Sequence, residues 1–184
     1  MTCENTKRGF TLIELLVVIA ILAVLAVAVV LVLNPAELLK QGRDTTRISD
    51  LAALNSAIAL YVADVRTTTW SNWTYCTAST SFWGNGSCTQ SATTTVDGTG
   101  WVPVKFTDIS SGSPLARLPL DPTNVSPYYY GFAASTTVGY FELDANMEST
   151  KYASGGSADV ETNSKDGGNN GTLYEVGSSL TLIN

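Results

Sequence analysis

The chain has 184 residues, of which 14% are charged, and it carries a formal net charge of −6 with no histidine. This acidic balance gives no electrostatic basis for binding nucleic acid, and the lack of histidine excludes imidazole metal ligands and histidine-dependent catalytic triads. No clustered residues indicate catalysis, so we expect a non-enzymatic protein without catalytic residues and without a nucleic-acid partner.

An apolar segment extends from Phe10 to Leu33, and only Thr11 and Glu14 within it are polar. As an α-helix, these residues would span about 36 Å, which is enough to cross a hydrocarbon core of about 30 Å. An isolated strand would leave its backbone groups unpaired in lipid. We therefore expect a membrane-spanning helix.

Two basic residues, Lys7 and Arg8, come directly before the apolar segment. The positive-inside tendency then places the N-terminus in the cytoplasm and residues 34–184 outside. A cleaved secretory signal has a shorter apolar core that ends in small residues, whereas this run ends in Leu31-Val32-Leu33-Asn34-Pro35. We therefore expect a retained helix rather than a removed signal peptide.

Glu14 is the exception within the apolar segment, because hydrocarbon penalises an unpaired charge by roughly 2.5 kcal/mol or more at the bilayer centre. Its place near the helix start contributes only a few tenths to about 1 kcal/mol through the helix macrodipole. Two interpretations follow from the residue itself. Glu14 pairs with a cation, or it reaches the membrane interface or stays protonated.

The sequence Gly9-Phe10-Thr11-Leu12-Ile13-Glu14, with a short charged leader before it and a long apolar segment after it, resembles the prepilin signature of type IV pilins and pseudopilins. The resemblance implies that a prepilin peptidase cuts between Gly9 and Phe10 and methylates the new amino group of Phe10. It further implies that Glu14 pairs with the Phe10 amine of a neighbouring subunit when the pilus assembly machinery moves subunits out of the membrane.

The same resemblance implies two locations for the protein. It first lies in the cytoplasmic (inner) membrane with its head outside, and it then becomes part of an extracellular filament made of copies of itself and other pilins. Removing the leader, which has a net charge of +1, leaves an acidic mature chain with a net side-chain charge of −7.

Beyond Pro35 the pattern becomes that of an amphipathic helix. Its apolar positions include Ile48, Leu51, Leu54, Ile58 and Val65. We expect one long helix from about Phe10 to about Val65, kinked at Pro35 because proline lacks a backbone donor and clashes with the preceding turn. Asp44, Arg47 and Asp50 are spaced by three residues, which predicts exposed salt bridges of modest value.

Residues 66–100 are rich in Thr, Ser, Gly and Trp, which indicates a loop region with short strands. Cys76 and Cys88 lie in this region, and an oxidising exterior favours a disulfide between them over a metal site. Cys3 belongs to the leader and would be lost with it. The four tryptophans either form an adhesive surface or, more simply, pack within the head or between subunits.

Alternating apolar residues predict short strands near Val102–Phe106, Val138–Leu143 and Leu180–Leu182. A small antiparallel sheet packed on the outer half of the long helix follows, because the helix cannot otherwise bury its apolar stripe. The expected fold is α+β and type IV pilin-like. A second resemblance, to major pseudopilins of type II secretion, covers residues 118–122 and 127–130, with Asp121-Pro122 as a turn.

We expect four parts along the chain. They are a cleaved leader at 1–9, a transmembrane and filament-core helix at 10–35, an amphipathic helix at 36–65, and a globular head at 66–184 with an αβ-loop and antiparallel strands.

A late acidic loop binds calcium in the pseudopilins that this chain resembles. Asp159, Glu161 and Asp166 supply oxygen atoms at close spacing, which suits a hard cation. The simpler interpretation is a solvated loop, and we expect no other cofactor.

These features favour a structural subunit of a type IV pilus-like filament. Two alternatives stay open: a pseudopilin of a secretion or DNA-uptake system, and a membrane-anchored extracellular binding domain or enzyme. The second alternative leaves the Gly9-Phe10 junction and Glu14 without an explanation.

Overall fold

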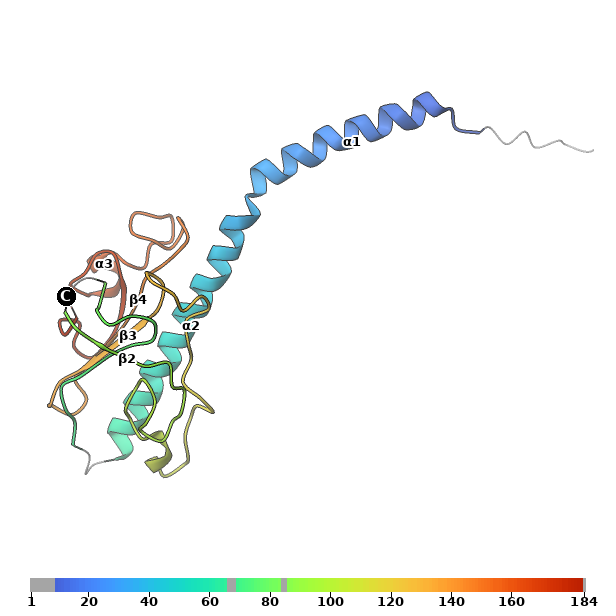
Figure 1. Cartoon of the computed structure of the whole chain (residues 1–184). Coiled ribbons are helices and arrows are strands. Elements are labelled where there is room, and N and C mark those ends of the chain that lie inside the picture. Colours follow the sequence, from blue (N-terminus) through green and yellow to red (C-terminus); the bar gives the residue numbers. More distant parts are fainter. Residues whose placement is uncertain (1–8, 66–68, 84–85, 184) are drawn as a thin grey trace, which may run out of the picture. The chain divides into compact units, whose positions relative to one another are not determined.

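The computed structural model describes residues 9–65, 69–83 and 86–183 (Figure 1). The predicted leader, apart from Gly9, lies outside the described residues. The chain divides into two compact units, the first ending at Leu38 and the second beginning at Leu39.

Helix α1 (Leu12–Leu33) forms most of the first unit. Every side chain described from Leu12 to Val30 is exposed, and this exposed surface is apolar all around the helix apart from Glu14. Such a helix is typical of a membrane span rather than of a helix that packs one face on a soluble core. Among the described residues, one helix is long and apolar enough to cross a membrane, and it begins at Leu12.

Asn34 separates α1 from α2 (Pro35–Asp64), so the expected single helix is two consecutive helices. Asn34 has a left-handed backbone conformation (φ 39°, ψ 73°), which asparagine tolerates better than most residues. Its side-chain oxygen accepts a hydrogen bond from the Glu37 amide at 3.4 Å. Pro35 is the first residue of α2, where its missing N–H removes no helical bond. The interruption between the two helices therefore lies at Asn34. A kink caused by Pro35 stays a prediction.

The second unit contains a mixed five-stranded sheet in the order β2-β1-β3-β4-β5. Its strands are β1 (Trp73–Cys76), β2 (Thr89–Gln90), β3 (Tyr130–Ala134), β4 (Phe141–Ala145) and β5 (Tyr174–Gly177). The pair β1–β2 is parallel and the other three pairs are antiparallel. The α+β class is confirmed, and the parallel pair differs from the fully antiparallel sheet that we expected.

One face of the sheet packs against α2 and forms the main core (Figure 1). Leu51, Leu54 and Ile58 of α2 are fully buried there, together with Phe132 of β3 and Leu143 of β4. These helix positions are among those that the amphipathic pattern selected. The burial of this apolar stripe is what holds the helix on the sheet.

The opposite face of the sheet carries a second, smaller core. Its buried residues are Cys76, Phe82, Cys88, Tyr129, Ala133 and Ile183. Cys76 and Cys88 form the expected disulfide, which ties β1 to the residue just before β2. The sheet is thus covered on both faces, by α2 on one and by loops and the C-terminal segment on the other.

Two of the expected strands do not form where the apolar alternation placed them. Residues 102–105 are irregular and lead into the short 3₁₀-helix η1 (Phe106–Asp108), and residues 180–182 also lie outside the strands. Apolar side chains of these segments fill core space from outside the strands. The alternation of apolar residues in the sequence therefore indicates buried side chains here, but not strand pairing. Within β4, Phe141 points into the main core, whereas Val138 and Tyr140 precede the strand and are exposed.

The tryptophans mostly serve the interior of the head. Trp70 and Trp101 are buried in the main core, and Trp73 packs against it. Trp83 stacks on Tyr129 with ring centroids 4.3 Å apart, beside the second core. These contacts support packing over an adhesive surface.

Candidate functional site

The residues just before and within the first turn of α1 form a capping box. Thr11 is the N-cap, and its hydroxyl oxygen accepts a hydrogen bond from the Glu14 amide at 3.3 Å. In return, Oε2 of Glu14 accepts bonds from the Thr11 amide at 2.8 Å and from the Thr11 hydroxyl at 2.6 Å. This reciprocal pattern satisfies amide groups that a helix start otherwise leaves without partners.

The capping box holds the Glu14 carboxylate at the very start of the apolar helix. Phe10 precedes it and is 85% exposed, so the residue that would become the mature N-terminus is not packed on its own chain. Both residues therefore lie at the start of α1, where Thr11 holds the Glu14 carboxyl group and the Phe10 side chain is exposed.

Gly9 comes directly before Phe10, and nothing in the structure requires a glycine there. A Cβ atom at this position would meet no other atom within 4 Å, and the backbone does not adopt a left-handed conformation. Within the described residues, therefore, neither a close contact nor the backbone conformation accounts for a glycine at position 9.

A comparison with known families identifies this N-terminal segment. Residues 5–30 match the family model described as the prokaryotic N-terminal methylation motif. The chain carries a prokaryotic N-terminal methylation motif. The match includes Gly9, Phe10 and Glu14 and is consistent with the type IV pilin and pseudopilin resemblance. No curated protein and no solved structure matches the chain.

The methylation motif indicates a prepilin peptidase substrate of the pilin type, and a pilin-type motif suggests a structural protein. Together with the apolar helix α1, the motif fits a protein that is anchored in a membrane before assembly.

Sequence reasoning assigned Glu14 a macrodipole contribution and a partner in another subunit, but it missed Thr11. The signal was present, because Thr11 and Glu14 have the S/T-x-x-E spacing of a capping box directly before an apolar run. Within the methylation motif, Glu14 therefore has a role in its own helix in addition to any role between subunits.

Outside the methylation motif, α2 is fastened to the head by Arg47. Its guanidinium donates to Asp121 at 2.6 and 2.9 Å, to Asp44 at 2.7 Å and to Glu148 at 2.6 Å. The side chains of Arg47, Asp44 and Asp121 are fully buried. Our expectation of exposed, modest salt bridges is wrong here, because loops of the head cover this part of the helix.

The expected pairing of Arg47 with Asp50 is also wrong for the described structure. Asp50 instead accepts a hydrogen bond from the hydroxyl of Tyr130 at 2.8 Å. Tyr130 ends the second of the two stretches that resemble pseudopilins, and Asp121 lies in the first. Both stretches are thus connected to α2 by polar contacts, through Asp121 to Arg47 and through Tyr130 to Asp50.

Asp121 also builds the predicted turn with Pro122. Its Oδ1 accepts hydrogen bonds from the amides of Thr123 at 2.8 Å and Asn124 at 3.1 Å. Burial opposes ionisation of Asp121, but the bonds from Arg47 and Thr123 outweigh it and lower its pKa. The carboxylate is therefore both a turn former and the partner of the buried cation.

The acidic loop that we considered for calcium uses its carboxylates to hold its own backbone. Asp159 accepts bonds from the amides of Gly155, Glu161 and Thr162. Glu161 accepts bonds from the amides of Met147 and Ser154 at 2.7 and 2.9 Å, and burial raises its pKa to about 7.

The third carboxylate of that set, Asp166, accepts bonds from the amides of Gly168 and Glu175. Within the described parts of the chain, these three carboxylates do not form a group that could share one ion. Calcium at this loop stays a prediction.

Proposed function

We propose that this protein is a structural subunit of a type IV pilus-like filament. It is made as a precursor, cut after Gly9 by a prepilin peptidase, methylated at Phe10 and assembled through α1. The observation that carries the proposal is the methylation motif over residues 5–30, at the start of an apolar helix with a single charged residue, Glu14.

The local geometry around Gly9 supports processing at this junction. The fold places no demand on Gly9, so a small residue there serves the extended backbone that a protease cleft accommodates. Removing the first nine of the 184 residues leaves a mature chain of 175 residues that begins with Phe10.

The surface of α1 supports assembly with other copies. All described side chains of α1 are exposed, and apart from Glu14 they are apolar, so α1 needs lipid or other helices around it. Before assembly the membrane supplies this environment, with the head outside. In the filament, the helices of neighbouring copies and of other pilins supply it.

Glu14 sets how neighbouring copies align along their α1 helices in the proposed filament. The capping box fixes the carboxylate at the helix start, and cleavage creates a positively charged amine on Phe10. In our proposal, the amine of an incoming copy pairs with Glu14 of the copy before it, because an unpaired charge in an apolar surrounding is costly. The capping bonds keep the carboxylate oriented until that amine arrives.

Two substitutions at Glu14 separate capping from charge pairing. Glutamine can take the acceptor role in a capping box but carries no charge, whereas alanine can do neither. We expect both Glu14→Gln and Glu14→Ala to be processed normally and to form no filaments, as measured by electron microscopy and by the amount of protein in sheared surface fractions.

The control is Asp108→Asn, which removes one charge from an exposed position in the head and should leave filaments at the wild-type level. If Glu14→Gln forms filaments at the wild-type level while Glu14→Ala does not, Glu14 only caps the helix and the pairing proposal is wrong.

A pseudopilin is the second candidate, favoured by the resemblance of residues 118–122 and 127–130 to major pseudopilins. Cleavage after Gly9 and the pairing of Glu14 with the Phe10 amine would be the same in a pseudopilin as in a pilus subunit. The two candidates differ in the length of the filament. Long filaments on the wild-type cell surface support the pilus, whereas filaments that appear only on overexpression support the pseudopilin. A membrane-anchored binding domain or enzyme predicts an uncut chain that still begins at Met1.

A further inference from the structure

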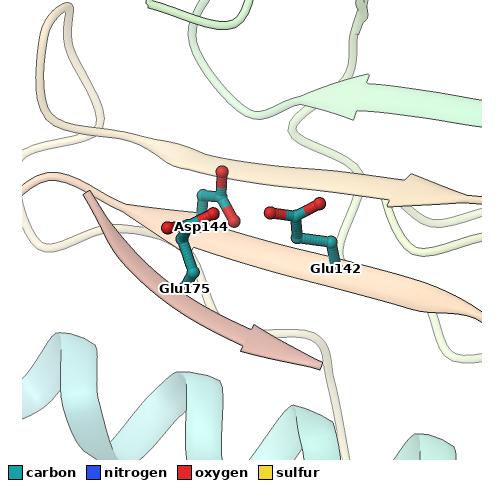
Figure 2. A group of neighbouring side chains, drawn as sticks. All are labelled: Glu142, Asp144 and Glu175. Atoms are coloured by element: carbon teal, nitrogen blue, oxygen red, sulfur yellow. The ribbon is translucent and has the colours of Figure 1, made fainter. Parts of the chain in front are cut away.

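Three carboxylates lie together on the face of the sheet that points away from α2 (Figure 2). Glu142 and Asp144 are two residues apart on β4 and therefore share a face, and Glu175 is the cross-strand partner of Asp144 on β5. Each residue offers one ligand atom, and these three atoms all lie within 4.8 Å of one another.

The three carboxylates are buried without a basic partner. Glu142 and Asp144 are 0% exposed, and Glu175 is 2% exposed. Lys165 lines the same surface pocket as Glu175, but no salt bridge between the described residues joins a Lys or Arg to the group. Like charges directly opposite each other on two strands destabilise a sheet, so this arrangement calls for a compensating group.

Asp144 points into the group (Figure 2). Among the described residues, both of its carboxylate oxygens are buried without a hydrogen-bond partner, and the same is true of Oε1 of Glu142. Buried polar atoms are almost always satisfied in folded proteins. A single proton shared within the group would satisfy only some of these oxygens, whereas a cation can bind all of them.

Backbone amides hold the carboxylates of Glu142 and Glu175 in place, and among the described residues Oε1 of Glu142 is left without a hydrogen bond. Oε2 of Glu142 accepts bonds from the amides of Leu182 at 2.6 Å and Ile183 at 2.8 Å. Oε1 and Oε2 of Glu175 accept bonds from the amides of Asn169 and Asn170. Such support orients carboxylate ligands before an ion binds.

Gly168 shows how closely the loop approaches this group. A Cβ atom at position 168 would lie 1.8 Å from Oε2 of Glu175, so only glycine permits the contact. The Gly-rich turn that follows Asp166 therefore passes close to the Glu175 carboxylate. This close approach explains why the turn has a glycine at position 168.

We propose that Glu142, Asp144 and Glu175 bind a divalent cation, with calcium as the best fit. Calcium takes oxygen ligands at roughly 2.3–2.6 Å, so two ligand atoms on opposite sides of the ion can be about 4.6–5.2 Å apart. The three ligand atoms all lie within 4.8 Å of one another, so they can contact one such ion. Magnesium usually keeps several waters and is bound through one or two carboxylates, so a buried group of three carboxylates suits calcium better.

The ion would connect parts of the head that are distant in sequence. Its ligands lie on β4 and β5, and their backbone partners lie in the 169–170 loop and in the C-terminal residues 182–183. The proposed site shares no residue with the Asp159, Glu161 and Asp166 set. It also does not depend on the filament role, because it concerns the head alone.

The test uses the full-length protein in detergent, stripped of metal with a chelator and then titrated with calcium. We expect one calcium ion bound per chain by isothermal titration calorimetry and a rise in the thermal unfolding temperature, with weaker binding of magnesium. If the stripped wild-type protein binds no calcium and its unfolding temperature does not change, the proposal is wrong.

The matched variants are Asp144→Asn and Asp108→Asn, which each remove one carboxylate charge. Asp144→Asn should weaken calcium binding at least 100-fold and remove the calcium-dependent rise, without lowering the unfolding temperature of the metal-free protein. Asp108→Asn should bind calcium like the wild type. Wild-type affinity in Asp144→Asn would overturn the proposal, and if that variant fails to fold, Glu142→Gln serves in its place with the same expectations.

Discussion

Arg47 is a side chain that connects several parts of the head. It is fully buried on α2 and binds Asp44, Asp121 and Glu148, which lie on the helix, in a turn and after β4. Replacing buried ion pairs as a whole can be harmless, but removing one partner leaves uncompensated charges. Replacing Arg47 therefore tests whether this network stabilises the head.

Replacing Arg47 with methionine should lower the free energy of unfolding by about 3–5 kcal/mol, because two buried carboxylates lose their cation. The matched control is Arg43→Met, since the Arg43 side chain is 33% exposed and its salt bridge is with Glu148 alone. We expect a much smaller loss for the control, because an ion pair that solvent reaches contributes little to stability. Urea unfolding of both variants, followed by circular dichroism, measures the difference, and equal losses would contradict the role of Arg47.

The same network makes the head sensitive to acid. Burial opposes ionisation of Asp121 and Glu148, but hydrogen bonds from Arg47 lower the pKa of Asp121, and those from Arg43 and Arg47 lower that of Glu148. Groups with a lowered folded-state pKa stabilise the fold above their unfolded-state values, here near 4, and this contribution is lost as the pH falls through the folded-state pKa.

We therefore expect the unfolding temperature of the wild-type protein to fall more steeply between pH 5 and pH 2 than that of Asp121→Asn. The comparison isolates Asp121, because the other titrating groups are present in both proteins. Parallel curves over this pH range would show that Asp121 does not contribute through its ionised form.

At the scale of elements, the helical stretch and the disulfide were predictable, but the division of that stretch at Asn34 and the loops that carry the polar network were not. The apolar run predicts α1, and the three-to-four spacing of Leu51, Leu54 and Ile58 predicts the buried face of α2. The strands were harder to predict, because Val102, Val104 and Phe106 alternate like a strand, yet the two valines fill the core from irregular backbone and Phe106 does so from η1. Their burial comes from tertiary contacts that local alternation does not encode.

The carboxylate group and the buried Arg47 network were missed for a related reason. One residue separates Glu142 from Asp144, but Glu175 is far from both in sequence. Only the register of β4 and β5 brings Glu175 beside them. Arg47 was taken as exposed because a helix pattern alone does not show which loops cover its polar face. Contacts between charged residues that are distant in sequence can be predicted only once the fold is known.

The disulfide is the element-scale feature with the clearest stability prediction. Cys76 and Cys88 are separated by 12 positions, and closing a loop of this size stabilises the fold by about 3 kcal/mol in the chain-entropy model. The double variant Cys76→Ser/Cys88→Ser should lose about that amount in urea unfolding. Cys3→Ser, in the predicted leader, is the control and should lose nothing, and an unchanged double variant would contradict the prediction.

At the scale of the whole molecule, the chain combines a helix suited to lipid with a head built on an internal polar network. The methylation motif assigns the first part to a processing route, and the disulfide suits an oxidising exterior for the second. Both parts are consistent with a protein that is anchored in a membrane before it is assembled. The filament itself is our proposal, and it depends on what happens at the Gly9-Phe10 junction.

Mass spectrometry of the N-terminal peptide of the protein, recovered from sheared surface filaments, tests this junction most directly. We predict a peptide that begins with N-methylated Phe10 and belongs to a mature chain of 175 of the 184 residues. A protein that still begins at Met1, found in the membrane of cells with an active prepilin peptidase, would contradict the account.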